Sequence, residues 1–201
     1  PHFARRLERM YLQNPDENVA FGLLADYKDA PVPTLPEDEN IATALEEAIH
    51  LLNRKYGNHF CLFLRGRSKS PSEKIYMGWE RKRGALIELN RFLLGREDRF
   101  EKVILPKGFR NNTAYILTLD ADTDLRIGAL RRLYATLKHP YNRPKVKNGV
   151  VVSGYGVLQP RMVTGVDSAG RSPFSALYAG GGGIDSYQNA VFDFYQSVFG
   201  R

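Results

Sequence analysis

The sequence predicts an α/β domain in which a mostly parallel sheet is flanked by helices. Short apolar runs of strand length alternate with amphipathic stretches of helix length along most of the 201 residues, as in proteins with such sheets. Hydrophobic residues make up 43% and charged residues 25% of the chain, which are ordinary proportions for a soluble globular protein. Neither an internal repeat nor a persuasive linker divides the chain, so we expect a single domain over residues 1–201.

The N-terminal part of the chain predicts two helices and two strands. Apolar residues recur at helical spacing in residues 2–13, and Asn14-Pro15 ends that helix because the residue before proline disfavours helical geometry. The continuous apolar run 19–25 predicts a buried strand that ends at Asp26. The other elements expected here are a helix that opens at the acidic residues 37–39 and a strand at 59–64.

The rest of the chain continues this alternation. A short strand at 115–119 is expected to deliver Asp120 to an edge of the sheet. Ligands of such sheets bind beyond the carboxyl ends of the strands, so Asp26 and Asp120 are candidate site residues. The other expected elements are a polar basic loop at 65–74, helices at 84–94, 126–138 and 185–199, and a strand at 150–158.

The net charge of +7 suits an anionic partner, such as nucleic acid, an anionic membrane face or a phosphorylated substrate. The basic residues are spread along the chain, and no aromatic-interleaved nucleic-acid motif accompanies them, so no nucleic-acid partner is expected. The single cysteine, Cys61, excludes an internal disulfide and a cysteine-based zinc site. No apolar run in the sequence is long enough to cross a bilayer.

The sharpest local feature is an acidic cluster, in which Asp120, Asp122 and Asp124 follow an apolar run at alternate positions. Carboxylates this close repel one another when all are ionised, and their hard oxygen atoms select Mg²⁺, Mn²⁺ or Ca²⁺. A divalent ion here would bridge a diphosphate and neutralise its charge as a leaving group. The alternative is an acidic turn without metal, in which Asp124 caps the following helix.

Three kinds of metal or phosphate site share such a motif. A calcium-binding EF-hand loop is excluded, because Leu125 stands where it needs glycine and Arg131 where it needs glutamate. A phosphatase of the haloacid dehalogenase type remains an alternative, with Asp120 as its nucleophile. Nucleotide-sugar transferases hold a metal on the donor diphosphate through a strand followed by Asp-x-Asp in mid-domain, and the position of Asp120 and Asp122 fits this class best.

Several longer motifs are more specific than an isolated Asp-x-Asp. The sequence reads Met-Gly-Trp-Glu-Arg-Lys-Arg-Gly at residues 77–84 and Glu-Leu-Asn-Arg at 88–91. Together with further blocks, which occur in order over nearly the whole chain, these motifs closely resemble the glycosyltransferase domain of cyclic β-1,2-glucan synthases. The further blocks are 23–31, 119–123, 154–161, 183–187, 193–196 and 199–200.

This resemblance implies a GT-A-like (Rossmann-like) fold and an inverting transfer of glucose from UDP-glucose to the 2-hydroxyl of a growing β-1,2-glucan. By the same resemblance, Asp120 and Asp122 hold Mg²⁺ or Mn²⁺ on the donor diphosphate, and Asp26 lies beside the nucleotide base or ribose. The other donor-site residues that the resemblance implies are Lys82, Arg83 and Gly84.

The chemistry of the individual residue types agrees with a donor site and leaves plainer interpretations open. Cationic side chains suit a diphosphate, whereas the run 81–83 taken alone is also typical of a solvated helix start. The indole of Trp79 suits stacking on a sugar, although a partly buried core position is the more common role for such a residue. Gln159 and Arg161 end an expected strand, where they face the donor or acceptor or are plain turn residues.

The resemblance also implies that the chain is part of a longer protein and that its domain is incomplete at both ends. The carboxylate that acts as general base is expected beyond Arg201, so we expect the 201 residues alone to bind the donor poorly and to be inactive. Synthesis of β-1,2-glucan by the isolated chain would contradict this expectation. The implied partners are UDP-glucose, a β-1,2-glucan acceptor, and the remaining domains and transmembrane segments of the parent protein, at the cytoplasmic face of the bacterial inner membrane.

Overall fold

The computed structural model describes residues 2–96, 99–109 and 113–160. The chain forms two compact units, Pro1–Leu130 and Arg131–Arg201. The first unit carries a sheet with its covering helices, and the described part of the second carries a helix and a hairpin. The expectation of a single domain over the whole chain stays a prediction.

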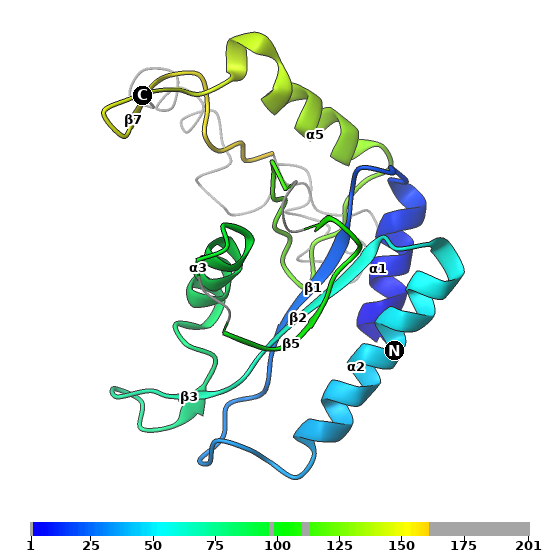
Figure 1. The fold of residues 1–201 in the computed structure, drawn as a ribbon, viewed down its shortest axis with the longest axis vertical. Coiled ribbons are helices and arrows are strands. Elements are labelled where there is room, and N and C mark those ends of the chain that lie inside the picture. The colour runs from blue at the N-terminus through cyan, green and yellow to red at the C-terminus, as the bar shows by residue number, and fades with distance from the viewer. Residues whose placement is uncertain (1, 97–98, 110–112, 161–201) are drawn as a thin grey trace, which may run out of the picture. The chain divides into compact units, whose positions relative to one another are not determined.

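The sheet of the first unit has three strands in the order β1-β2-β5 (Figure 1). Strands β1 (Phe21–Asp26) and β2 (Phe60–Arg65) are parallel, and their register pairs Asp26 with Arg65 at the carboxyl ends. Strand β5 (Phe100–Ile104) pairs with the other edge of β2 in the antiparallel direction. The fold is therefore mixed α/β, as predicted, but the described sheet is mixed rather than mostly parallel.

Helices cover both faces of this sheet, which explains why all six residues of β2 are buried. Helices α1 (His2–Gln13) and α2 (Asp38–Tyr56) contact β1 and β2, respectively. One face of β2 joins their core, and the opposite face packs against α3 (Arg81–Leu93). The buried side chains of the first core include Leu7, Met10, Ile49, Leu52, Phe60, Leu62 and Leu64, and those of the second are Cys61, Phe63, Leu89 and Phe92.

Residues 115–119 do not form the strand that their apolar character predicts, and this prediction is wrong. A strand requires a neighbouring edge that satisfies its backbone groups, and residues 115–119 join no ladder among the described strands. Tyr115, Ile116 and Leu117 are consequently exposed. Asp120 therefore follows an irregular segment rather than a strand.

Other predicted boundaries are close to the observed ones. The expected polar loop 65–74 contains the short strand β3 (Ser68–Lys69), which pairs with β4 (Tyr76–Met77). The helix expected at 84–94 begins earlier, as the bounds of α3 show. The helix expected at 185–199 lies outside the described residues.

The C-terminal described elements contain no fully buried residue. Helix α5 (Ala129–Lys138) has no buried residue, and the 3₁₀ turn η1 (Pro140–Asn142) follows it. The strand expected at 150–158 is shorter and forms a hairpin, in which β7 (Val150–Ser153) pairs with β6 (Lys145–Lys147). No helix in the described part of the chain is long and apolar enough to span a bilayer.

Candidate functional site

The carboxyl ends of the two parallel strands are joined by an ion pair between Asp26 and Arg65. Both oxygens of the Asp26 carboxylate accept hydrogen bonds, from Nε and Nη2 of Arg65, at 2.6 Å each. Such a bidentate pair is the strongest and most directional form of this interaction. Asp26 thus lies at a strand end, as predicted, but its carboxylate is already engaged by a neighbouring strand.

The remaining N–H groups of Arg65 donate to residues of α3 and of the turn before it. Nη1 donates to Glu88 Oε2 at 2.8 Å and to the carbonyl of Trp79 at 3.0 Å, and Nη2 donates to the carbonyl of Arg81 at 2.9 Å. All five N–H groups of the guanidinium therefore have acceptors, although its side chain is only 2% exposed. Burial alone would lower the pKa of Arg65, but the hydrogen bonds to the two carboxylates outweigh it and the pKa is raised.

The turn that wraps around this guanidinium depends on two glycines. A Cβ atom on Gly78 would lie 2.4 Å from Oδ2 of Asp26, and one on Gly84 would lie 1.8 Å from the carbonyl oxygen of Trp79. Between them, the backbone of Glu80 has the left-handed φ of 52°. Gly84 is buried, so its small size is required by this packing, and its predicted place beside a donor stays a prediction.

The same turn presents Lys82 outward, where it meets the acidic cluster. The ammonium of Lys82 forms an ion pair with Oδ1 of Asp120, 38 residues further along the chain. The two side chains are 68% and 52% exposed, so water competes with this pair. The structure therefore brings together two residues that the sequence predicts for one site. Trp79, which precedes the first turn of α3, is 38% exposed, which leaves part of its indole accessible.

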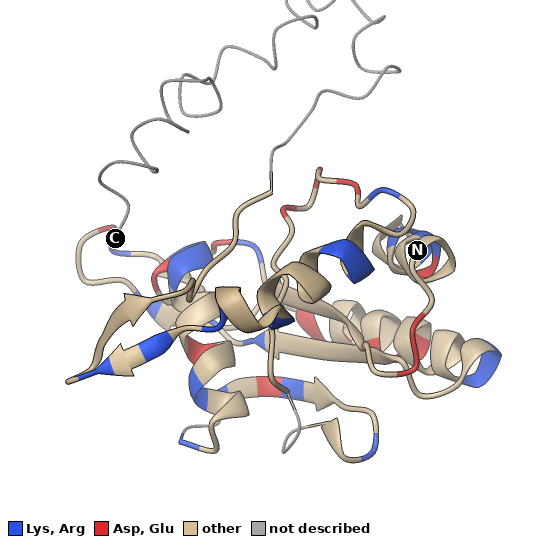
Figure 2. Ribbon diagram, turned by 90° about the horizontal axis from the view of Figure 1, so that it is seen from above, with Lys and Arg blue, Asp and Glu red and all other residues tan. Residues whose placement is uncertain are grey.

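Helix α1 contacts the acidic loop 120–124 from the other side (Figure 2). Arg6 donates hydrogen bonds to the carbonyls of Ala121 and Thr123, and Arg9 donates to Asp124 at 2.6 Å. The carboxylate of Asp124 is thereby engaged in an ion pair with Arg9. The loop closes through a turn in which the amide of Thr123 donates to the carbonyl of Asp120 at 3.0 Å.

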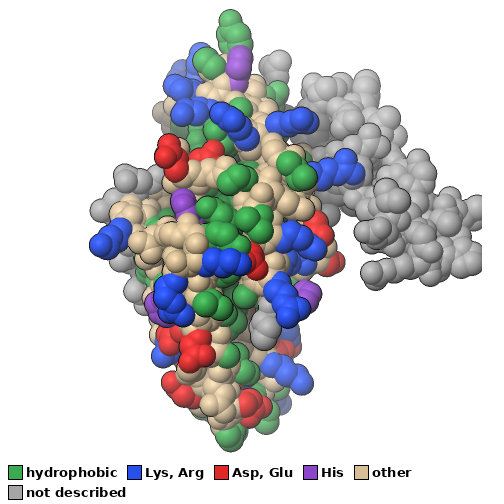
Figure 3. Space-filling view, turned by 90° about the vertical axis from the view of Figure 1, so that its right-hand side faces the viewer, with side chains coloured by type: hydrophobic (Ala, Val, Ile, Leu, Met, Phe, Trp, Pro, Cys, Tyr) green, Lys and Arg blue, Asp and Glu red, His purple; other side chains and the backbone are tan. Residues whose placement is uncertain are grey.

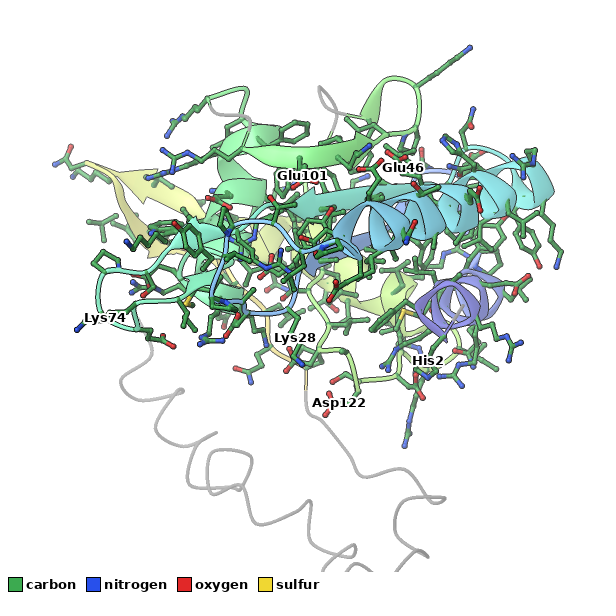
Figure 4. The ribbon with its side chains drawn as sticks, turned by 90° about the horizontal axis from the view of Figure 1, so that it is seen from below. His2, Lys28, Glu46, Lys74, Glu101 and Asp122 are labelled. Carbon is green, nitrogen blue, oxygen red and sulfur yellow. The ribbon has the colours of Figure 1, made fainter. Side chains whose placement is uncertain are left out.

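Two carboxylates of the loop are the candidates for a divalent ion. Asp122 is exposed and lies at the outer edge of its loop, and Asp120 already holds a cationic group, the ammonium of Lys82 (Figure 4). Within the described residues, no three His, Cys, Asp or Glu side chains gather around one point. Mg²⁺ is commonly bound by one or two carboxylates, with substrate phosphates and water completing the shell. Asp120 and Asp122 therefore fit a metal that is held jointly with a diphosphate.

The remaining predicted residues are Arg83, Gln159 and Arg161. Arg83 is exposed and pairs with Glu80 of its own turn at 2.8 Å. Gln159 is exposed in the described part of the second unit. Arg161 lies outside the described residues, so its predicted role is open. Basic side chains are distributed over the face drawn in Figure 3 rather than gathered in one patch, as their spread along the sequence predicts.

Arg6, Arg9 and Glu88 bind the acidic loop or Arg65, and none of the three was predicted from the sequence. Two signals were present: arginines three residues apart lie on one face of a helix, and Glu88 interrupts the buried face of α3. A buried carboxylate of this kind requires a partner, and its partner is Arg65. Which partner it has depends on the packing of α3, which the local sequence does not determine.

The fold and the strand-end site define the chain as a mixed α/β protein with charged groups clustered beyond its parallel strands. No protein-family model matches it. It is 36% identical, over 207 aligned residues and 98% of its own length, to the cyclic β-(1,2)-glucan synthase NdvB of Rhizobium meliloti (strain 1021). The chain is thus related to a segment of a cyclic β-(1,2)-glucan synthase, which confirms the resemblance seen in its motifs. It spans about 7% of the length of this curated relative.

Proposed function

We propose that the chain forms the donor-binding part of an inverting glucosyltransferase of the GT-A type, which transfers glucose from UDP-glucose to a growing β-1,2-glucan. The observation that carries this proposal is the similarity over 98% of the chain to a protein named as a cyclic β-(1,2)-glucan synthase. The meeting of Lys82 and Asp120 supports it, because the two residues come from separate motifs of the same predicted donor site.

The donor diphosphate is proposed to bind where Lys82 meets the acidic loop. A diphosphate ester needs cationic partners, and the exposed ammonium of Lys82 is free to move from Asp120 to a phosphate oxygen. Asp120 and Asp122 would then hold Mg²⁺ or Mn²⁺, which supplies charge neutralisation for the departing diphosphate. Lys82 adds a second positive charge, and its release from Asp120 frees a carboxylate oxygen for the metal.

The nucleoside and sugar are proposed to lie along the turn before α3. Each carboxylate oxygen of Asp26 has further lone-pair capacity beside its bond to Arg65, and the side chain is 28% exposed, so it can accept a hydrogen bond from a base or ribose. The accessible part of the Trp79 indole suits stacking on a flat ring. Arg83, Gly84, Gln159 and Arg161 remain proposed contacts.

The chemical step requires a general base. An inverting transfer deprotonates the attacking hydroxyl of the acceptor, and we propose that the carboxylate responsible lies outside residues 1–201. The described residues therefore bind and orient the donor. Attachment to further domains and to the cytoplasmic face of a membrane is part of the same proposal.

Ligand-induced stabilisation tests the donor site directly. UDP together with Mn²⁺ is expected to raise the melting temperature of the chain, because a ligand that binds only the folded state stabilises it by mass action. Asp122→Ala is expected to abolish this rise. Glu47→Ala removes an exposed carboxylate from α2 and serves as the matched control, which should retain it. An equal rise in Asp122→Ala and in the control would contradict the proposal.

The dehalogenase-type phosphatase has no observation in its favour. Its nucleophile sits at the end of a strand, whereas residues 115–119 before Asp120 form none. Hydrolysis of a phosphate ester with a covalent aspartyl-phosphate on Asp120 would revive that alternative.

A further inference from the structure

The acidic loop 120–124 lacks the usual support of a loop at a sheet edge. The segment before the loop pairs with no described strand. Leu125, which follows the loop directly, is buried at 8% exposure. Within the loop, the amide of Thr123 reaches back to the carbonyl of Asp120. Leu119 before the loop packs against the core and Lys82 pairs with Asp120, and the rest of the loop is contacted by helix α1.

Helix α1 supplies those contacts through one guanidinium. Arg6 Nη1 donates to the carbonyl of Ala121, and Nη2 donates to the carbonyl of Thr123 and lies 3.5 Å from Oδ1 of Asp124. The Arg6 side chain is only 13% exposed, whereas that of Arg9, which also reaches Asp124, is 53% exposed. Arg6 is thus the shielded and multiply bonded member of the two.

The C-terminal end of the same helix holds the chain that follows the loop. The amide of Gly128 donates to the carbonyl of Gln13 at 3.3 Å, and the amide of Leu130 donates to Oδ1 of Asn14 at 3.2 Å. Residues 121–130 are therefore attached to α1 at two places, at Arg6 in the middle of the helix and at Gln13 and Asn14 at its C-terminal end. Arg6 makes the attachment at the acidic end.

The pattern of acceptors divides the loop into two sets of groups. Arg6 takes the carbonyls of Ala121 and Thr123 and approaches Asp124, so these groups face α1. The carboxylates of Asp120 and Asp122 are left to other partners: the first holds an exchangeable ammonium, and the second is exposed. The guanidinium of Arg6 thus binds the backbone acceptors of the loop and leaves the carboxylates of Asp120 and Asp122 available to a ligand.

We propose that Arg6 is a positioning residue, which fixes the loop so that Asp120 and Asp122 are presented together to the metal–diphosphate of the donor. The proposal rests on the proposed function of that loop. Arginine is required because its planar fork addresses several acceptors at fixed angles, whereas a lysine ammonium is a point charge on a flexible stem. Arg6 acts through the loop and does not touch the donor.

The test compares Arg6→Ala, Arg6→Lys and Arg5→Ala in the same chain. Arg5 is an exposed arginine one position earlier on α1, so its replacement removes the same charge without the loop contacts shown for Arg6. Two quantities are measured: hydrogen–deuterium exchange of the amides of residues 121–124, and the affinity for UDP in the presence of Mn²⁺ by calorimetry. The melting temperature is recorded to establish that each variant is folded.

Arg6→Ala is expected to speed exchange in the loop and to weaken UDP–Mn²⁺ binding by about tenfold, because the charged hydrogen bonds that order the loop are lost and the loop must be ordered on binding. Arg6→Lys should fall between Arg6→Ala and the wild type, and it replaces Arg6→Ala in the comparison if that variant does not fold. Arg5→Ala should leave both quantities unchanged. Unchanged loop exchange in folded Arg6 variants overturns the proposal, as does faster exchange with unchanged affinity, because Arg6 is then only structural.

Failure of the proposed function gives a different result. In that case the wild-type chain does not bind UDP with Mn²⁺, while the exchange of residues 121–124 still shows whether Arg6 holds the loop. Faster exchange in Arg6→Ala without donor binding in the wild type retains Arg6 as the anchor of the loop and rejects the donor site.

Discussion

Two ion-pair clusters of the first unit contrast sharply in burial. In the first, Arg65 is 2% exposed and each of its donors has an acceptor on Asp26, Glu88 or the turn before α3. In the second, Lys82 and Asp120 meet with more than half of each side chain in contact with water. In the buried cluster every N–H group of Arg65 is already used, whereas the exposed pair loses little when a ligand replaces one partner. We infer that the first builds the site and the second is the part that responds to a ligand.

The largest expected effect is that of Arg65→Ala. Removing the guanidinium leaves the buried carboxylate of Glu88 and the partly exposed carboxylate of Asp26 without their cation, and breaking a buried pair in this way costs about 3–5 kcal/mol. Urea unfolding of the variant against the wild type measures this loss. Arg83→Ala, which removes an exposed arginine from the same turn, should change the free energy of unfolding by less than about 1 kcal/mol. Comparable values for both variants would remove the contrast between the clusters.

The second effect concerns the turn that binds this guanidinium. In Gly84→Ala, the new methyl group meets the backbone carbonyl of Trp79, which has no side-chain freedom to move away. The start of α3 must shift, at a cost of about 1–3 kcal/mol. In Gly66→Ala, the nearest atom is a carboxylate oxygen of Glu101 at 3.1 Å, which can rotate, so the cost should be smaller. Thermal unfolding of the two variants gives the comparison, and equal melting temperatures would show that the turn adapts freely.

Local pattern determined much of the fold, as α1 illustrates. The helix expected at 2–13 and the apolar runs of β1 and β2 were predicted because periodicity and burial are encoded within a few residues. Strand β5 was missed, since its pairing with β2 depends on residues about 40 positions away. Residues 115–119 were wrongly predicted as a strand, because an apolar run becomes one only where a neighbouring edge accepts it.

The candidate site shows the same division. Asp120 and Lys82 were recognised from their motifs, and the structure adds that they meet. The partner of Asp26 was not predicted, because it follows from the register between β1 and β2. Arg6 was missed for a similar reason, since its acceptors lie 115 and 117 residues further along the chain. The sequence thus indicated the type of chemistry, and the packing determines which groups remain available for it.

The third effect is a pH dependence of the stability that arises from Cys61, which is buried in the core cluster packed against α3. Burial raises the pKa of its thiol from 9.0 to about 12. The thiol of the unfolded chain therefore ionises first as the pH rises, so this contribution to stability is complete below pH 9 and is lost between pH 9 and 12. The loss is about 1.4 kcal/mol for each pH unit in that window.

The variant Cys61→Ala isolates this contribution from other titrating groups. The difference in unfolding free energy between wild type and Cys61→Ala should shrink by about 1.4 kcal/mol from pH 8 to pH 10. Denaturant unfolding at the two pH values measures it. A constant difference would mean that the thiol ionises equally in the folded and unfolded states, and hence that the core beneath α3 admits water.

The smallest effect on stability, and the one that examines the exposed cluster most directly, is expected for Lys82→Ala. Its pair with Asp120 is largely solvated, so the free energy of unfolding should change by less than about 1 kcal/mol.

The effects of Lys82→Ala on the affinities for Mn²⁺ and for UDP should have opposite signs. Mn²⁺ alone should bind more tightly, because the ammonium no longer competes for the Asp120 carboxylate, whereas UDP in the presence of Mn²⁺ should bind more weakly, because the diphosphate loses a cationic partner. Lys69→Ala, which removes an exposed cation from β3, is the control and should change neither affinity appreciably. If Lys82→Ala also weakened the binding of Mn²⁺ alone, the ammonium would be holding the Asp120 carboxylate in position and would not be occupying the place of the metal. The exposed pair would then be structural, like the buried one.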